Sequence, residues 1–235
     1  MSIWTRLAEI VSAVVAKGEG LIALFDRRGA PPEKSVAFTI AIVCLGAKMA
    51  KSDGQVNVAE VRAFRQVFQI APEDEAAAAR VFNLARQDVA GFDAYAERIA
   101  RMFRRQPRML EDILDGLFYV AVADGGYADE ERAFLGRVAE IFGIPAAVFA
   151  CIEARRTGDA SRDPWQVLGL PRDADLAEAR TRWRKLVREN HPDRLVARGL
   201  PRESVTLANA RLAAINAAWE ELSARLAHPA PSAAE

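Results

Sequence analysis

Residues 175–193 read DLAEARTRWRKLVRENHPD, and this stretch predicts an amphipathic helix that ends at a fixed loop. Apolar side chains recur at intervals of three and four positions, which places them on one face of a helix. The other face is basic and carries Arg180, Arg182, Arg184, Lys185 and Arg188. Because proline disfavours helical geometry in the residue before it, the helix has to stop at His191-Pro192-Asp193.

Helices are predicted on both sides of this stretch. Residues 163–170 read DPWQVLGL, a short helical turn with aspartate in the capping position, proline in the first turn and glycine at the end. A longer helix from about residue 202 to residue 226 presents a matching apolar face. Residues 163–227 are therefore expected to form two antiparallel helices joined by a loop that carries His-Pro-Asp. Residues 228–235, rich in Pro, Ala and Ser, are expected to form a disordered tail.

The remainder of the chain also has helical periodicity, so the predicted fold class is all-α. Two segments form an internal near-repeat: DGQVNVAE at 53–60 and DGGYADEE at 124–131 each follow one helix and begin another. Glycine permits the left-handed turn, and the acidic side chains favour the positive end of a helix dipole. We expect a pseudo-symmetric helical bundle at 27–156, an amphipathic helix within 1–26 and a polar linker at 157–162.

The acidic residues of the repeat admit a second interpretation. Asp53 and Glu60, and likewise Asp124 and Glu131, are carboxylates seven positions apart that could converge on a hard cation. The spacing lacks the alternate-residue oxygen ligands of an EF-hand loop, and helix capping explains the same residues. We therefore predict neither a metal site nor a cofactor.

Composition restricts the classes of function. The 235 residues carry no net charge, which argues against a global field for nucleic acid or an anionic membrane. The two cysteines, Cys44 and Cys151, are too few for a disulfide framework or a zinc ribbon. The sequence contains no evident nucleophile–base pair, phosphate loop or metal cluster. We therefore do not expect an enzyme and assign no catalytic residue.

The C-terminal module resembles the J-domain of the DnaJ family. That family's pattern runs Asp-Pro-aromatic, Leu-Gly, aromatic-Arg-Lys-Leu, His-Pro-Asp and Ile-Asn-x-Ala-aromatic-x-x-Leu. The same elements occur here in the same order: Asp163-Pro164-Trp165, Leu168-Gly169, Trp183-Arg184-Lys185-Leu186, His191-Pro192-Asp193 and Ile215-Asn216-Ala217-Ala218-Trp219-Glu220-Glu221-Leu222.

The loop at residues 194–201, RLVARGLP, resembles that of the DjlA-type co-chaperones, which place a TerB-like helical domain before a J-domain. The repeated Asp-Gly units resemble the TerB-like domain. The sequence departs from the family in lacking an N-terminal membrane span, in using tryptophan at 165, 183 and 219 where tyrosine is usual, and in placing Arg182 where alanine is usual. It also lacks the Gly/Phe-rich and Cys-rich regions of DnaJ, so client binding of the DnaJ kind is not expected.

The resemblance implies a co-chaperone that binds a DnaK-type chaperone and stimulates its ATP hydrolysis. It assigns the activating loop to His191, Pro192 and Asp193. It assigns the chaperone-binding basic helix to Arg180, Arg184, Lys185 and Arg188. The TerB-like domain would serve as a targeting module for an unidentified client, and self-association into a homodimer is left open. The alternative is a stress-response scaffold of the tellurite-resistance type, in which the J-domain only tethers the chaperone.

Localisation is predicted from the first apolar stretch. Charged residues interrupt it, and no run approaches the roughly 20 apolar residues that cross a bilayer. We expect a cytoplasmic protein without a signal peptide or transmembrane segment. Peripheral membrane contact through the amphipathic helix of residues 1–26 is the alternative.

Overall fold

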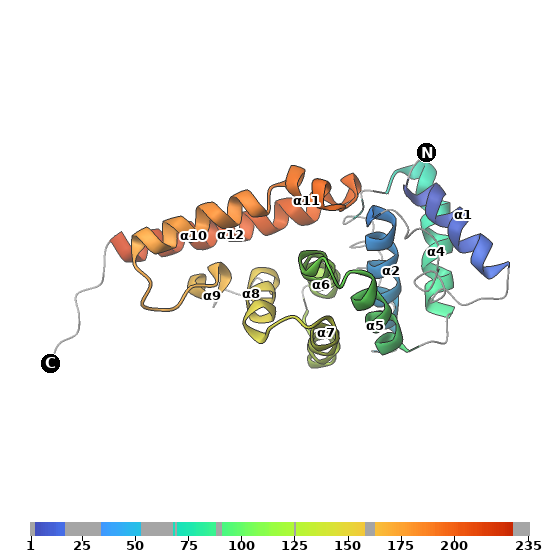
Figure 1. Ribbon diagram of the computed structural model, residues 1–235, viewed down its shortest axis with the longest axis horizontal. Helices are drawn as coiled ribbons and strands as arrows, with labels where there is room; N and C mark the ends of the chain where they lie inside the picture. The colour runs from blue at the N-terminus through green and yellow to red at the C-terminus, as the bar shows by residue number, and fades with distance from the viewer. Residues whose placement is uncertain are drawn as a thin grey trace.

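The computed structural model describes residues 3–16, 34–52, 68, 70–87, 91–124, 126–157 and 163–227. Every regular element in these ranges is helical, so the predicted all-α fold class is confirmed. The molecule is elongated, with the N-terminal helices at one end and the C-terminal helices at the other (Figure 1). The first Asp-Gly unit, most of the predicted linker and the predicted tail lie outside the described residues.

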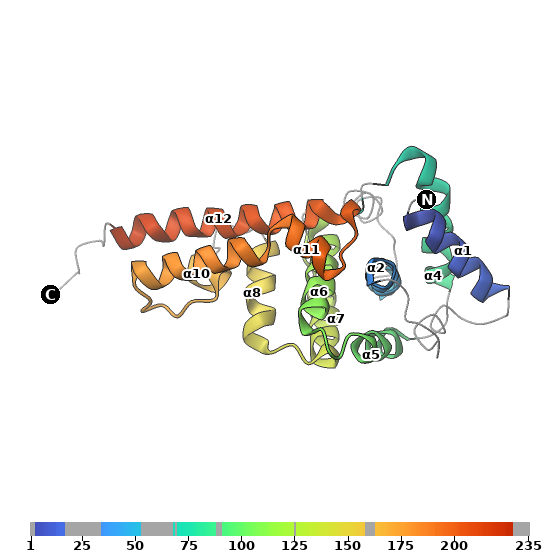
Figure 2. The same ribbon diagram turned by 45° about the horizontal axis from the view of Figure 1, so that its top comes forward.

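The N-terminal helices pack around α2. Their bounds are α1 (Ile3–Val15), α2 (Lys34–Ser52), α4 (Glu75–Gln87), α5 (Phe92–Met102), α6 (Pro107–Ala121), α7 (Asp129–Phe142) and α8 (Ala146–Arg156), with 3-10 turns at Pro72–Asp74 and Val122–Asp124. α2 is apolar on all sides, and such a helix is stable only when it is buried. Figure 2 looks almost along α2, with α6 on one side and α1 and α4 on the other.

The second Asp-Gly unit lies between α6 and α7. A carboxylate oxygen of Glu131 accepts a hydrogen bond from the backbone N–H of Ala128 at 2.9 Å, which caps the start of α7. The helix ends at Gly143, whose φ of 68° is the left-handed conformation that glycine permits. The capping interpretation is therefore confirmed for Glu131, whereas Asp53, Glu60 and the side chain of Asp124 lie outside the described residues.

The C-terminal helices form the expected hairpin. Their bounds are α9 (Pro164–Leu168), α10 (Leu176–Glu189), α11 (Pro192–Arg198) and α12 (Val205–Ala227), with a 3-10 turn at Arg202–Ser204. Asp163 accepts a hydrogen bond from the N–H of Trp165, and Asp175 accepts one from the N–H of Glu178, so the predicted starts of α9 and α10 are confirmed. α10 and α12 lie side by side in Figures 1 and 2, around a core that includes Leu186.

One local expectation was wrong. Residues 192–198 form the helix α11 rather than a loop, because proline suits the first position of a helix as well as it ends the preceding one. The tryptophans Trp165, Trp183 and Trp219 are half-buried and pack against the core of the C-terminal helices. The rings of Trp183 and Trp219 stack at 5.1 Å between centroids, and Trp183 Nε1 donates to Asn216 Oδ1 at 2.9 Å, so one ring edge stays near solvent.

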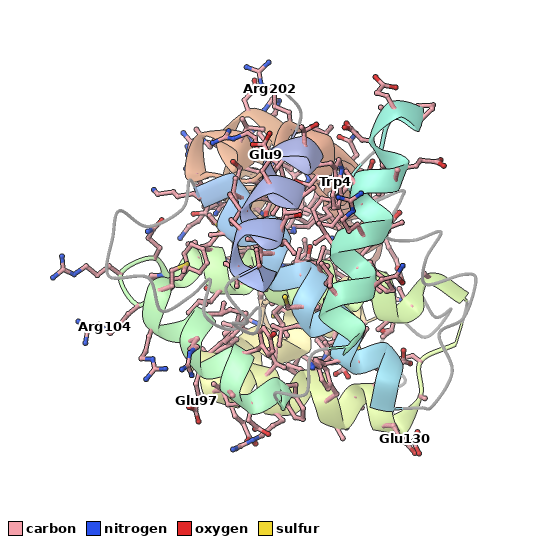
Figure 3. The ribbon with its side chains drawn as sticks, turned by 90° about the vertical axis from the view of Figure 1, so that its right-hand side faces the viewer. Trp4, Glu9, Glu97, Arg104, Glu130 and Arg202 are labelled. Atoms are coloured by element: carbon pink, nitrogen blue, oxygen red, sulfur yellow. The ribbon has the colours of Figure 1, made fainter. Side chains whose placement is uncertain are left out.

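The apolar stripe of α1 belongs to the protein's own core. Leu7, Val11 and Val14 are buried, and Trp4 packs edge-on against Phe68 with centroids 5.5 Å apart. Figure 3 shows Trp4 between α1 and α4, with Glu9 on the outside of α1. In the part of the chain that the structure describes, no helix is both long and apolar enough to cross a bilayer.

The localisation predicted from the sequence is wrong as stated. It allowed peripheral membrane contact through residues 1–26, but the apolar stripe that would enter the membrane is covered by α2 and α4. Its assignment to the cytoplasm rested on the lack of an apolar run, which identifies no compartment. The same burial makes the stripe unavailable to a second copy of the chain.

The two ends of the molecule share one apolar core at their junction. Leu195, Leu200 and Leu207, from α11, the segment after it and α12, are buried in the same cluster as the helices of the N-terminal part. Gly116 of α6 permits this close packing, because a Cβ there would lie 2.5 Å from Ile42 and 3.5 Å from Leu207. The domain boundaries predicted at 156 and 163 stay predictions, but the modules on either side are in extensive contact.

A buried network of ion pairs crosses the same junction, and we call it the α6 charge network. Asp112 and Asp115 of α6 face Arg156 of α8 and Arg211 of α12, and all four side chains are almost fully buried. Arg211 donates to Asp112 Oδ1 at 2.7 Å and to Asp115 Oδ2 at 2.7 Å. Arg156 donates to both oxygens of Asp115 and, at 3.2 Å, to the backbone carbonyl of Leu207.

The two carboxylates of the network respond differently to burial. Burial raises the pKa of Asp115, but the charges of Arg156 and Arg211 outweigh it and hold that pKa well below its ordinary value. At Asp112 burial dominates over Arg211 and Arg198, and the pKa is raised. Asp115 is therefore the carboxylate whose charge holds the junction together.

Replacing Asp115 by Asn is expected to lower the free energy of unfolding by about 3–5 kcal/mol, because the buried Arg156 loses its carboxylate partner and Arg211 keeps only Asp112. Folding lowers the pKa of Asp115, so its carboxylate stabilises the fold above the unfolded-state pKa of about 3.9 and stops doing so as the pH falls toward the folded value. The difference between wild type and D115N should therefore shrink below about pH 4. Urea denaturation at several pH values measures it.

Asp93 provides the matched control for this prediction. It pairs with Arg137 at 3.0 Å, but both side chains are about half exposed, so Asp93→Asn should change stability little. Equal losses in D93N and D115N would contradict the importance of the buried network.

Candidate functional site

His191-Pro192-Asp193 caps the start of α11 and faces outward. His191 has an extended backbone, and Pro192 takes the first helical position, which its fixed φ suits. His191 Nδ1 accepts a hydrogen bond from the backbone N–H of Asp193 at 3.3 Å. The side chains of His191 and Asp193 are 56% and 92% exposed, so both are presented to solvent on a fixed turn.

The four basic residues predicted to bind a chaperone all lie exposed on α10. They are Arg180, Arg184, Lys185 and Arg188, and they face away from the buried residues Ala179 and Leu186. Lys185 approaches Glu189 at 4.0 Å, whereas the three arginines form no ion pair with any described residue. This side of α10 is therefore available to an acidic partner surface.

A shallow depression connects the loop to the basic face. It measures about 440 Å³, and the apolar side chains of Trp183 and Val187 line it. The other side chains that line it are polar or charged: Arg184, Arg188, Arg194, His191 and Asp193. The structure thus brings the loop and the C-terminal part of the basic face into one surface, while Arg180 lies further along α10.

The residue before the loop ties it to the interior. Asn190 is buried, and its Nδ2 donates to the carbonyl of Leu186 at 2.7 Å. Its Oδ1 accepts a hydrogen bond from Arg211 at 2.9 Å, and Arg211 belongs to the α6 charge network. His191 is therefore one residue away from a chain of buried hydrogen bonds that ends in α6.

Arg182 does not share the orientation of the other basic residues. Its Nε donates to the carbonyl of Leu168 at 2.8 Å, so the side chain is half-buried against the end of α9. The expectation that it lies on the same basic face as Arg180 and Arg184 was wrong, because a helix has more than two faces and Arg182 lies on the one that meets α9.

The α6 charge network was not predicted from the sequence. Asp112 and Asp115 stand three positions apart on α6, where almost every neighbouring position is buried. Charged residues inside an otherwise apolar helix are a signal that could have been noticed. The partners Arg156, Arg198 and Arg211 are far away in the sequence and carry no such signal.

Comparison with known proteins adds to this geometry. A family model described as tellurite resistance protein TerB matches residues 39–154. The co-chaperone protein DjlA of Coxiella burnetii is 29% identical, with 74% of this chain and 72% of the relative covered. DjlA of Photobacterium profundum is 24% identical (88% and 84% covered), and DjlA of Escherichia coli K12 is 25% identical (73% and 73% covered). No solved structure matches.

The chain is similar to the DjlA-type co-chaperones over most of its length. These similarities confirm the resemblance drawn from the sequence and support a co-chaperone of the DnaJ family. The segment matched by the TerB model, called the TerB domain below, runs from within α2 to within α8, so Asp112 and Asp115 lie inside it. Arg211 and Asn190 lie outside it, and the α6 charge network therefore joins the TerB domain to the C-terminal module.

Asn190→Ala should lower the free energy of unfolding by about 1–3 kcal/mol, because it removes two buried hydrogen bonds and leaves a donor of Arg211 unpaired. His191→Gln should change it by less than about 0.5 kcal/mol, because the His191 side chain is exposed. Urea denaturation of the two variants beside the wild type measures both values. A large loss in H191Q would mean that His191 has a structural role.

Proposed function

We propose that the chain is a J-domain co-chaperone that binds a DnaK-type chaperone and stimulates its ATP hydrolysis through His191-Pro192-Asp193. The observation that carries the proposal is the outward presentation of this tripeptide on a fixed helix start, next to the exposed basic face of α10. The names of the DjlA relatives support the same class of function.

Each part of the surface has a physical role in the proposal. Arg180, Arg184, Lys185 and Arg188 attract an acidic surface of the chaperone and speed association. Pro192 and the buried Asn190 keep His191 and Asp193 in place, so little conformational entropy is lost when the chaperone binds. The chemistry belongs to the partner, whose conformational equilibrium shifts when it engages the loop. The chain itself is not an enzyme in this proposal and needs no cofactor.

The TerB domain supplies targeting in this proposal. It selects a client or a partner, and the α6 charge network holds the J-domain at a set orientation beside whatever the TerB domain binds. The scaffold alternative differs in one respect: the J-domain would only tether the chaperone, and stimulation of ATP hydrolysis would be dispensable in the cell.

Adding the full-length protein should accelerate steady-state ATP hydrolysis by the DnaK-type chaperone of the same organism, and His191→Gln should reduce the stimulation by about tenfold or more. The substitution removes an exposed imidazole whose only hydrogen bond among the described residues is the one from the Asp193 N–H, so the fold should be retained. A coupled ATPase assay, with circular dichroism of the variant as a folding control, measures it. Undiminished stimulation of ATP hydrolysis by H191Q would contradict the proposed mechanism. Loss of stimulation with full complementation of a deletion strain would favour the scaffold.

Stimulation should weaken as salt rises from about 50 to 300 mM, since exposed charge contacts are screened over about 8 Å at physiological ionic strength. Arg184→Glu and Arg188→Glu should each raise the Kd for the chaperone by about tenfold while changing the maximal rate less. Arg101→Glu is the matched control, because Arg101 is exposed on α5. If the control weakened binding as much as the α10 variants, the basic face of α10 would have no special part.

A further inference from the structure

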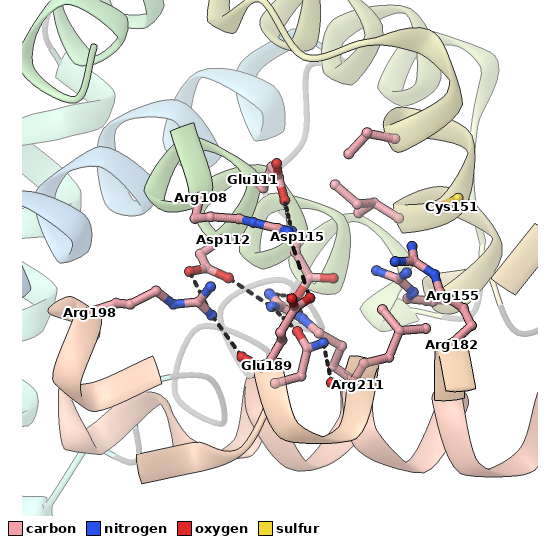
Figure 4. A pocket seen from close by; sticks show the side chains of 14 residues that line it. Arg108, Glu111, Asp112, Asp115, Cys151, Arg155, Arg182, Glu189, Arg198 and Arg211 are labelled. Atoms are coloured by element: carbon pink, nitrogen blue, oxygen red, sulfur yellow. Dashed lines mark hydrogen bonds and ion pairs between the residues drawn. The ribbon is translucent and has the colours of Figure 1, made fainter. Parts of the chain in front are cut away.

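A second pocket lies where α6, α8 and α10 meet, away from the His-Pro-Asp surface. Its volume is about 280 Å³, and its wall combines residues of the TerB domain with residues of the C-terminal module (Figure 4). Cys151 and Arg155 come from α8, and Arg182 comes from α10. On its other side the pocket borders the α6 charge network, which includes Asp115 and Arg211.

The carboxylates around this pocket are already engaged. Asp112 and Asp115 face the arginines of the α6 charge network. Glu111 pairs with Arg108 at 2.9 Å, and Glu189 lies 3.7 Å from the same arginine. Two guanidinium groups, Arg155 and Arg182, have no carboxylate partner among the described residues, so the pocket wall has uncompensated positive charge.

Backbone contacts hold these two guanidinium groups in place. Arg155 Nε donates to the carbonyl of Val167 at 3.0 Å, and Arg182 Nε donates to the carbonyl of Leu168 at 2.8 Å. Because the two carbonyls belong to consecutive residues, the groups are held next to each other. The Nε atom of each group donates to a backbone carbonyl, and the Nη groups are therefore available to a ligand.

The close surroundings of Arg182 confirm that it is confined. A Cβ on Gly169 would lie 3.1 Å from Arg182 Nη2 and 3.2 Å from Cys151 Sγ. Gly169 also has a φ of 66°, so glycine is favoured there both by the lack of space for a Cβ and by the left-handed backbone. The cysteine thiol and the Arg182 fork are therefore near neighbours at the pocket wall, as Figure 4 also shows for the labelled Cys151 and Arg182.

The positive charge of Arg155 is destabilised where it stands. Burial and the nearby charge of Arg211 lower its pKa to about 10, and Arg182 adds to the effect, while Cys151 and Asp115 oppose it. Like charges that are withdrawn from water repel more strongly than at an exposed surface, because the effective dielectric constant is lower. An anion between Arg155 and Arg182 would relieve this repulsion.

We propose that this pocket binds a phosphate-type oxyanion between Arg155 and Arg182. Two guanidinium forks present several N–H donors from two elements, which suits a tetrahedral anion with acceptor oxygens on all sides. A dianion also matches two positive charges, whereas a single carboxylate offers one charge and two coplanar oxygens. The ligand would connect α8 of the TerB domain to α10, so its binding would reinforce the junction between the two modules. This inference is independent of the role proposed for His191.

Phosphate binding can be measured on the full chain by thermal unfolding and titration calorimetry at constant ionic strength. About 10 mM inorganic phosphate should raise the Tm by about 2–4 °C in comparison with chloride. Sulfate should act like phosphate, and acetate should have little effect. Glycerol phosphate tests the source of the ligand: tighter binding than inorganic phosphate points to a phosphate ester, and equal binding points to the free ion.

Variants separate this site from general salt effects. Arg155→Gln and Arg182→Gln should abolish the rise in Tm, and Arg182→Lys should weaken phosphate binding about tenfold because the fork is lost. Arg180→Gln is the matched control on the exposed side of α10 and should keep the full response. An equal rise in all variants, or an equal response to acetate, would overturn the proposal.

Cys151 gives a second readout that needs no arginine variant. Alkylation of Cys151 by iodoacetate, an anionic reagent, should slow when phosphate is present, because phosphate occupies the positive wall beside the thiol. Mass spectrometry distinguishes Cys151 from Cys44, which is buried. A rate of Cys151 alkylation that does not respond to phosphate, together with an unchanged Tm in wild type, would rule out the site.

Discussion

Two carboxylates of α6 and two guanidinium groups, from α8 and α12, are withdrawn from water together, and the arrangement of the whole molecule depends on their mutual attraction. Burying any one of these charges alone would be strongly unfavourable. Together, Asp115, Arg156 and Arg211 are joined by hydrogen bonds of 2.7–2.9 Å, and Oδ1 of Asp112 accepts another from Arg211. The attraction is also directional, because each guanidinium fork fits its carboxylates in one orientation only. α12 is thereby fixed against α6 in a single register.

One buried residue, Arg211, connects the α6 charge network to the exposed loop. Arg211 serves both the acidic pair and Asn190, and Asn190 immediately precedes His191. The exposed loop is therefore held by buried hydrogen bonds, and carboxylates of the TerB domain take part in them. In a chain where the two modules were joined only by a flexible linker, the loop and the TerB domain would sample many orientations. Here the shared apolar core around Leu207 and the α6 charge network hold the loop and the TerB domain in one relative orientation.

The local features of the fold were predictable because they depend on neighbours in the sequence. The positions of aspartate, proline and glycine indicated where α9 and α10 start and end, and apolar periodicity indicated their buried faces. The exposure of Arg180, Arg184, Lys185 and Arg188 followed from the same periodicity. The orientation of the Arg182 side chain did not follow from the periodicity, because it depends on α9 lying across that side of α10. The helix α11 was missed since a tripeptide that ends one helix can also begin the next.

The sequence by itself determined the all-α class, the TerB and DjlA resemblance, and the position of His191-Pro192-Asp193 at a helix boundary, because each of these is written in residues close together along the chain. The tertiary structure decided everything that depends on residues far apart. Only the folded chain brings Asp115 to Arg211, 96 positions later, and places Arg155 beside Arg182 at one pocket. It also decided that the apolar stripe of α1 is core rather than surface. The physical reason is that burial and charge pairing depend on distances in space, which periodicity along a helix does not specify.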